Sequence, residues 1–152
     1  MATVFNSPQE LLGKEGQVLD ASAWLTIDQQ RIDQFAAVTG DRQWIHVDPE
    51  RARAGPFGTT IAHGYLTVSL MGTLLPQIIE VRNFSMGVNV GVDGLRFLAP
   101  VPVGSRIRAS GTIVKVEERK AGAIQCVVRV TIEMEGEPKP ACVLDTISRY
   151  LP

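Results

Sequence analysis

Residues 65–79 of the chain, YLTVSLMGTLLPQII, form its longest apolar stretch. Leucine or isoleucine recurs there every four residues, and further apolar residues widen the stripe around most of a helical circumference. A helix of that kind belongs in a core or an interface, and Pro76 should end or kink its last turn. The stripe consists of Leu66, Leu70, Leu74 and Ile78, and the residues that widen it are Val68, Met71, Leu75 and Ile79.

The second half of the chain has a period of two instead of four. From Ile124 to Met134, apolar residues alternate with mostly polar ones, as in a half-buried antiparallel strand. Two more alternating sets lie at residues 107–113 and 88–92, and residues 142–150 supply a last strand. A buried helix followed by several long antiparallel strands predicts an α+β domain, with the sheet wrapped around that helix.

Shorter elements precede the apolar helix. We expect a short helix at Ser7-Pro8, a strand over residues 17–25, and a helix that begins with a capping box at residues 26–29 and ends at Gly40. The apolar face of that second helix comprises Ile32, Phe35 and Ala36, and a further short helix runs from Asp48-Pro49 to Gly55-Pro56.

The composition limits the classes of protein to which the chain can belong. A length of 152 residues is typical of one domain, which we expect to span residues 1–152, and 45% hydrophobic residues argue against disorder. A net charge of −1 provides no basic field, so we expect no nucleic-acid partner. No apolar segment is long enough to cross a membrane, and we expect no membrane association.

The cysteines, the N-terminus and the sheet bear on location and assembly. Cys126 and Cys142 are too few and too far apart for a disulfide framework, and the N-terminus lacks the basic and apolar regions of a signal peptide. We therefore expect a cytoplasmic protein. A single curved sheet leaves an edge free to pair with another copy, so we also expect a dimer.

The two histidines of the chain lie close together in the sequence, among small and apolar residues. Asp41 follows the helix-ending Gly40, and His46 comes five residues later. Taken singly, Asp41 is a turn aspartate and His46 a structural core histidine. Together, a carboxylate and an imidazole that share one water molecule can divide the roles of general base and general acid. This pair is the candidate catalytic site, and the sequence leaves open which residue takes which role.

The segment Ile61-Ala62-His63-Gly64 opens the apolar helix. A backbone N–H in the first turn of a helix has no partner within the helix, and the helix dipole favours negative charge there. The Gly64 N–H can therefore receive the charge of an enolate, with Ala62 and His63 as neighbouring candidates for substrate contact. The alternative is that Gly64 permits a tight loop and that His63 caps the helix or packs.

Other chemistries have weaker support in the sequence. His46 and Asp48 could ligate a metal, but no further ligands stand at suitable spacing, so we expect no metal and no separate cofactor. A simpler interpretation than a metal ligand is that Asp48 is the N-cap of the helix that follows it. Gly87, Gly91 and Gly94 lack the spacing of a phosphate-binding loop and indicate a bend in a strand or a close approach of two chain segments. No Ser–His–Asp arrangement or nucleophile elbow is present.

Residues 35–52, FAAVTGDRQWIHVDPERA, resemble the hydratase 2 motif of the MaoC-like, (R)-specific enoyl-CoA hydratases. In that motif an aromatic residue leads to Gly-Asp, then to an aliphatic residue and His, and then to Ala or Ser six positions later. The downstream Ile61-Ala62-His63-Gly64, followed by an apolar helix, is similar to the family's next block. The residues in register with the motif are Phe35, Gly40, Asp41, Ile45, His46 and Ala52.

The resemblance covers residues 15–150 in element order. It implies a hot-dog fold, in which an antiparallel sheet wraps around a long central helix, here residues 65–79, and it implies a homodimer. It also implies reversible addition of water to trans-2-enoyl-CoA to give (R)-3-hydroxyacyl-CoA, so coenzyme A arrives as part of the acyl-CoA thioester substrate. By this resemblance Asp41 and His46 hold and activate the water, and the Gly64 N–H binds the thioester oxygen.

Two positions depart from the family, and two alternative functions stay open. The family usually has Asn-Pro where this chain has Gln43-Trp44, and it often carries a serine near the position of Gly72. One alternative is a (3R)-hydroxyacyl-[acyl-carrier-protein] dehydratase, with the same chemistry on another carrier. The other is a non-catalytic acyl-thioester-binding partner subunit. A thioesterase fits the spacing between the aspartate and the histidine less well.

Overall fold

A computed structural model describes residues 1–152, and its strands form two sheets. The strands are β1 (Thr3–Phe5), β2 (Leu25–Thr26), β3 (Ile79–Val81), β4 (Met86–Phe97), β5 (Arg106–Glu118), β6 (Ile124–Met134) and β7 (Cys142–Leu151). The larger sheet is antiparallel, with the order β2-β5-β6-β7-β4, and β1 pairs with β3 in a small parallel sheet. The predicted α+β class is confirmed.

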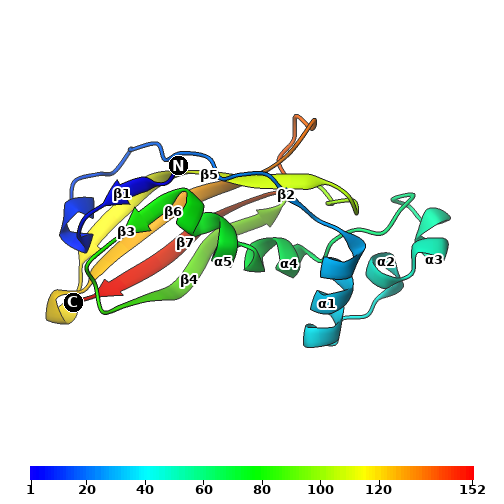
Figure 1. The fold of residues 1–152 in the computed structure, drawn as a ribbon, viewed down its shortest axis with the longest axis horizontal. Coiled ribbons are helices and arrows are strands. Elements are labelled where there is room, and N and C mark those ends of the chain that lie inside the picture. Colours follow the sequence, from blue (N-terminus) through cyan, green and yellow to red (C-terminus); the bar gives the residue numbers. More distant parts are fainter.

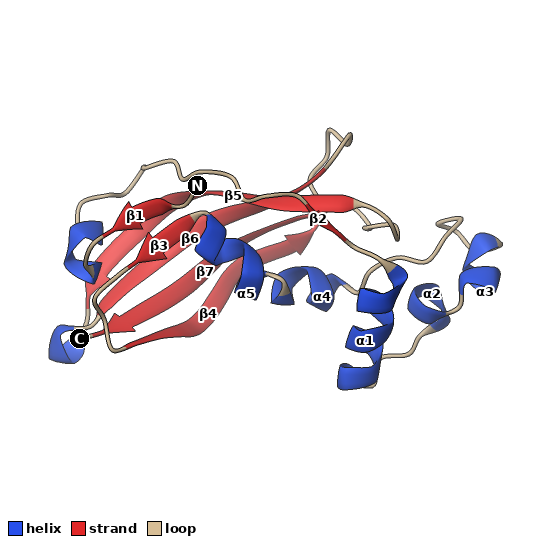
Figure 2. Ribbon diagram, in the orientation of Figure 1, coloured by secondary structure: helices blue, strands red, loops and turns tan.

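The helices are short and lie in two places. Figure 1 shows α4 and α5 along one face of the curved sheet, and α1, α2 and α3 grouped beyond one end of it. Figure 2 shows that the grouped helices connect to one another through loops and not through strands. None of the helices is long and apolar enough to cross a membrane. The helices are α1 (Gln29–Thr39), α2 (Trp44–Val47), α3 (Pro49–Arg53), α4 (Gly64–Ser69) and α5 (Met71–Leu74), with 3-10 turns at Pro8–Leu11, Leu75–Gln77 and Lys120–Gly122.

Helix α1 begins two residues later than the predicted capping box places it. Asp28 is its N-cap, and the Asp28 side chain accepts a hydrogen bond of 2.8 Å from the backbone N–H of Arg31. At the other end Gly40 adopts a left-handed conformation with φ 82°, as predicted. Asp48 caps α3 as expected, by accepting a bond from the Arg51 N–H.

The predicted continuous helix over residues 65–79 is wrong in its extent. Helix α4 ends at Ser69, Leu70 interrupts the regular pattern with ψ −7°, and α5 runs only to Leu74. Pro76 has no N–H to bond the carbonyl of Gly72, so the chain tightens there into a 3-10 turn. Ile79 then belongs to β3 instead of the helix.

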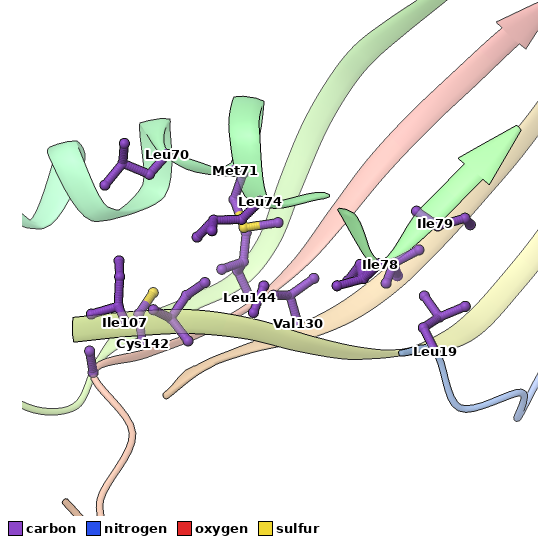
Figure 3. Packing of buried hydrophobic residues seen from close by; sticks show 14 of the residues in the cluster. Leu19, Leu70, Met71, Leu74, Ile78, Ile79, Ile107, Val130, Cys142 and Leu144 are labelled. Carbon is purple, nitrogen blue, oxygen red and sulfur yellow. The ribbon is translucent and has the colours of Figure 1, made fainter. Parts of the chain in front are cut away.

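The core lies between this broken helix and the sheet. Figure 3 shows Leu70, Met71 and Leu74 above strand residues that include Val130 and Leu144. The alternation predicted for the strand from Ile124 to Met134 is confirmed, because the six alternating apolar positions are all buried and the intervening residues, Val127 among them, are not. These six are Ile124, Cys126, Val128, Val130, Ile132 and Met134.

The strand predicted over residues 17–25 is wrong apart from its last residue. Backbone hydrogen bonds join Leu19 to Gly111 and Ser22 to Ala109, and Leu25 is then paired with Ile107. Each step of three residues along this segment therefore matches a step of only two residues along β5. A regular strand ladder pairs residues one to one, so this segment cannot form one. The Ser22 hydroxyl compensates by accepting from the Ala109 N–H at 2.9 Å.

Strand β4 forms as predicted, but its valines are not half-buried. Val88, Val90 and Val92 are 37%, 43% and 38% exposed, because β4 is an edge strand and the register shift at Val90 turns Val88 and Val92 to opposite faces of the sheet. The pairing of β4 with β7 shifts register twice, and Gly94 lies in the second shift with φ 60°. The bend that the glycines indicate is confirmed.

Candidate active site

Three segments meet at the helical end of the molecule and bring the predicted pair together with His63. These segments are the loop that joins α1 to α2, helix α2 itself, and the residues just before α4. A carboxylate oxygen of Asp41 and one ring nitrogen each of His46 and His63 lie within 4.8 Å of one another. A water molecule that makes two hydrogen bonds of about 2.8 Å can bridge the Asp41 carboxylate and His46 across such a separation.

His46 lies on α2 and is buried, with 6% of its surface exposed. Its Nδ1 donates a hydrogen bond of 2.7 Å to the carbonyl oxygen of Ile61, which leaves the lone pair on Nε2 in the neutral ring. Burial lowers the pKa of His46 below its ordinary value of 6.5. The bond to Ile61 and the Asp41 charge oppose this lowering of the pKa, and His63 adds to it. A neutral imidazole with a free Nε2 is a proton acceptor at neutral pH.

His63 is the N-cap residue of α4, and its side chain makes no cap bond; of the two structural roles considered from the sequence, capping is absent and packing is present. Its Nε2 donates to the backbone carbonyl of Asp41 at 2.9 Å. The ring stacks on that of His46, with centroids 3.8 Å apart and planes at 22°, and it meets the Phe35 ring edge-on. The Nδ1 atom of His63 is buried and has no hydrogen-bond partner.

Asp41 follows the left-handed Gly40 and is exposed. Its carboxylate accepts only a long bond of 3.4 Å from the Gln43 N–H, the turn contact considered from the sequence. The carboxylate is therefore free to bind water or a substrate next to the two imidazoles.

Gly64 and Ala62 line a groove of about 370 Å³ whose walls are mostly apolar. Gly64 is the first residue of α4, so no helical carbonyl precedes its N–H to accept it. A Cβ atom at Gly64 would lie 2.9 Å from the Phe97 ring across the groove. The Ala62 N–H is already bonded to the carbonyl of Val101 at 2.8 Å, so Ala62 contributes a wall and no free donor.

The arrangement of the imidazoles favours hydrogen bonding over metal coordination. Asp41, His46 and His63 are of types that can ligate a metal, but the two rings are stacked with their planes at 22°, so their lone pairs run side by side and do not converge as the ligands of a tetrahedral ion do. The Asp48 carboxylate caps α3, so it is not available as the partner ligand to His46 that the sequence raised. The absence of a metal and of a separate cofactor stays a prediction.

Two residues of the site were missed by the sequence reasoning. The Thr60 hydroxyl, on a residue 1% exposed, donates to Gln29 Oε1 at 2.6 Å, and Gln29 Nε2 donates to the backbone carbonyl of His46 at 2.8 Å. These bonds tie α1 and the segment before α4 to the main chain of His46. No local pattern identifies them, because a polar residue in the first turn of a helix is usually read as a cap.

Trp44, which departs from the usual family pattern, does not face the two imidazoles. The Arg51 guanidinium lies 4.4 Å from its ring centroid, and a Cβ at Gly55 would lie 2.9 Å from the indole. The indole therefore fastens α2 to α3 and its following turn.

Comparisons with known proteins give the family. Residues 11–136 match the MaoC like domain. The chain is 49% identical over 147 residues to 3-hydroxyacyl-thioester dehydratase Z of Mycobacterium tuberculosis, with 97% of each chain covered. It is 33% identical over 131 residues to the (R)-specific enoyl-CoA hydratase of Rhodospirillum rubrum, which covers 82% of this chain and 84% of that protein.

A solved structure shows the same architecture. The (R)-hydratase from A. caviae involved in PHA biosynthesis superposes with a TM-score of 0.72 and 25% identity, over 90% of this chain and 97% of that one. The likeness confirms the predicted hot-dog fold, and the names of the relatives, dehydratase and hydratase, confirm the predicted enzyme class, a hydro-lyase. The chain belongs to the MaoC-like domain family of hydratases and dehydratases.

Proposed function

We propose that this protein catalyses the reversible addition of water to a trans-2-enoyl-CoA thioester, giving the (R)-3-hydroxyacyl-CoA. The observation that carries the proposal is the convergence of Asp41, His46 and His63 within 4.8 Å, near the unpartnered N–H of Gly64. A water held between Asp41 and His46 and an enolate oxygen held by the Gly64 N–H are what the addition requires.

The reaction uses His46 as the group that moves the proton. Neutral His46 takes a proton from the water through Nε2 while the oxygen forms a bond to C3 of the enoyl thioester. The electron pair of the C2–C3 double bond moves toward the thioester oxygen, which accepts a hydrogen bond from the Gly64 N–H. The imidazolium, beside the Asp41 carboxylate, then returns a proton to C2, so the pair ends as it began.

The groove beside Gly64 suits the thioester and the chain next to it. Its lining is mostly apolar, which favours the hydrocarbon part of an acyl thioester over a charged substrate. Coenzyme A enters only as part of this substrate. The relatives named for 3-hydroxyacyl thioesters and enoyl-CoA support the assignment, and the acyl-carrier-protein form of the substrate is the second candidate.

A hydration assay tests this function. Purified protein is mixed with crotonyl-CoA and with longer trans-2-enoyl-CoA substrates, and loss of the enone absorbance and the configuration of the product are measured. Asp41→Asn and His46→Gln should each lower kcat by about 10² or more, whereas Asp20→Asn, an exposed aspartate elsewhere, should not change it.

Each outcome of the assay has a meaning. No turnover by folded protein with any chain length overturns the function, and tight binding of acyl-CoA without turnover favours the non-catalytic subunit. Near-normal rates in both variants overturn the assignment of the pair. A kcat/KM that is higher on the acyl-carrier-protein substrate favours the dehydratase on that carrier.

We further infer that two copies of the chain associate through β4 into a homodimer. This strand lies at the end of the sheet order, so one of its edges is unpaired, and it carries the exposed apolar residues Val88, Val90 and Val92. The double substitution Val88→Asp and Val90→Asp should give a folded monomer in sedimentation experiments, and an unchanged dimer would place the interface elsewhere. The cytoplasmic location and the absence of nucleic-acid and membrane partners stay predictions.

A further inference from the structure

His63 is a buried side chain that contacts both members of the catalytic pair, although the proposed reaction assigns it no proton to move. It is 3% exposed, it bonds to the main chain of Asp41, and it stacks on the ring of His46. These contacts join two segments that are separated by more than twenty residues in the sequence.

The bond from His63 to Asp41 is the strongest tie on that residue. Asp41 has two other hydrogen bonds, one from its N–H to the Thr39 hydroxyl and one from the Gln43 N–H to its carboxylate, and both are 3.4 Å long. The bond from His63 Nε2 to the Asp41 carbonyl is 2.9 Å. Because the carboxylate is exposed, this bond is what fixes the position from which the side chain reaches the site.

The stack fixes the plane of the His46 ring in the same way. The bond to Ile61 holds one atom of that ring, Nδ1, and leaves rotation about the bond open. The face of the His63 imidazole, 3.8 Å away, blocks that rotation, and Phe35 supports His63 edge-on. The bond to Ile61 and the stack on His63 together fix the direction in which Nε2 of His46 points.

The stack also couples the charges of the two rings. A positive charge on His63 disfavours one on His46, and it acts with burial to lower the pKa of His46. The titratable groups that act on His46 are His63 and Asp41, and Phe35, on the remaining side of His63, is uncharged.

The unpartnered Nδ1 of His63 argues against a purely structural role. Leaving a buried acceptor without a partner costs about 1–3 kcal/mol. A phenylalanine could fill the same space with no polar atom at all. Only an imidazole supplies a donor, a stacking face and a titratable group together.

We propose that His63 is a positioning residue, which holds the Asp41 main chain through Nε2 and the plane of the His46 ring through the stack. The proposal rests on the function proposed above, because the positioned groups are those that bind and deprotonate the water. His63 acts through Asp41 and His46.

Two substitutions separate the parts of this role. In His63→Gln the side-chain amide can still donate to the Asp41 carbonyl, but the titratable stacking ring is lost. In His63→Phe a ring remains, but the donor and the titratable group are lost. We expect kcat to fall by about 10-fold in His63→Gln and by about 10² in His63→Phe, with KM nearly unchanged in both.

The pH dependence distinguishes positioning from simple support of the fold. Both substitutions remove the titratable ring that lowers the pKa of His46, so the acid limb of the kcat/KM profile should move to higher pH in both. A structural role would lower Tm and the active fraction and would leave that limb where it is in wild type. Equal kcat values in wild type and both variants, or unmoved acid limbs, would overturn the proposal.

A readout without turnover keeps this proposal separate from the proposed function. The chain has two histidines, so each His63 variant leaves His46 as the only imidazole in the NMR spectrum of ¹⁵N-labelled protein. The pKa of His46 should rise in both variants. If the pKa of His46 rises in the variants but the protein hydrates no enoyl thioester, the proposed function is wrong and the positioning role of His63 is retained. If the pKa of His46 is the same in wild type and the His63 variants of an active enzyme, only the positioning role is overturned.

Discussion

The Nδ1 atom of His46 lies 2.7 Å from the carbonyl oxygen of Ile61, on a segment fifteen residues away in the sequence. Since a carbonyl oxygen only accepts, the proton is on Nδ1 and the free lone pair is on Nε2. The Ile61 N–H in turn donates to the carbonyl of Ile45 at 3.0 Å, so the two segments are bonded in both directions. The neutral tautomer of His46 is built into the way these segments pack.

The first prediction concerns pH. The pKa of His46 is below 6.5 in the folded chain, mainly through burial, so the unfolded chain binds a proton at His46 at higher pH than the folded chain does. The contribution of His46 to stability is therefore present above pH 6.5 and is lost as the pH falls through its folded pKa. Tm measured between pH 8 and pH 5 should fall at the acid end, and the fall should be smaller in His46→Gln.

The second prediction concerns the bonds from Thr60 through Gln29 to His46. Thr60→Val keeps the shape of the buried side chain but leaves Gln29 Oε1 unpaired, so unfolding in urea should lose about 1–3 kcal/mol. We expect kcat to fall as well, because the main chain of His46 loses its anchor on Gln29. Thr60→Ser keeps the hydroxyl and should recover most of kcat. Equal rates in Thr60→Val and wild type would contradict a role for this anchor.

The third prediction isolates the N–H of Gly64. Gly64→Pro removes that N–H at a first helical position, where proline is favoured, and the extended ψ of 138° at His63 is the conformation that precedes proline. We expect kcat to fall by about 10²–10³ relative to Gly64→Ala. The alanine variant is the matched control, since it adds a Cβ against Phe97 and keeps the N–H. If the two variants have the same kcat, the N–H does not hold the developing charge.

The fourth prediction uses two glycines with opposite surroundings. A Cβ at Gly55 would meet the Trp44 ring at 2.9 Å, so Gly55→Ala should destabilise the protein by about 1–3 kcal/mol and disturb α2. A Cβ at Gly72 in α5 would meet nothing within 4 Å, so Gly72→Ala should stabilise by about 0.5–1 kcal/mol. Urea unfolding measures both changes, and a shift in Trp44 fluorescence should accompany the first alone.

The strands were predictable from the sequence wherever the signal is local. Along β6, alternate side chains point to opposite faces, so the apolar residues from Ile124 to Met134 report directly on which face is buried. The valines of β4 have the same alternation, and their strand was predicted for the same reason. Their exposure was not predictable, because it depends on what covers the face of an edge strand.

The elements that were mispredicted depend on partners distant in the sequence. The segment from Leu19 to Leu25 has strand-like residues, but its three-to-two register against β5 is set by the strand beside it. The apolar stripe of residues 65–79 predicts that this segment is buried, but it does not determine whether the segment forms one continuous helix. The break at Leu70 and the β3 strand at Ile79 arise from packing on the curved sheet.

The residues of the candidate site also fall into those that local sequence predicts and those that depend on distant partners. Asp41, His46 and Gly64 stand out because their residue types and spacing carry chemistry. The roles of His63, Gln29 and Thr60 come from bonds that span at least seventeen residues, and no periodicity records those.

Both imidazoles are oriented by main-chain carbonyls, His46 by that of Ile61 and His63 by that of Asp41. Replacing the side chain at either acceptor position therefore leaves the orienting oxygen in place. Asp41 has two separable functions in consequence, a carboxylate that mutation can delete and a carbonyl that mutation cannot. Substitutions at residue 41 can therefore change the polarity and charge of the side chain next to the bound water, while the two imidazole rings keep their orientation. This makes residue 41 a suitable position for engineering.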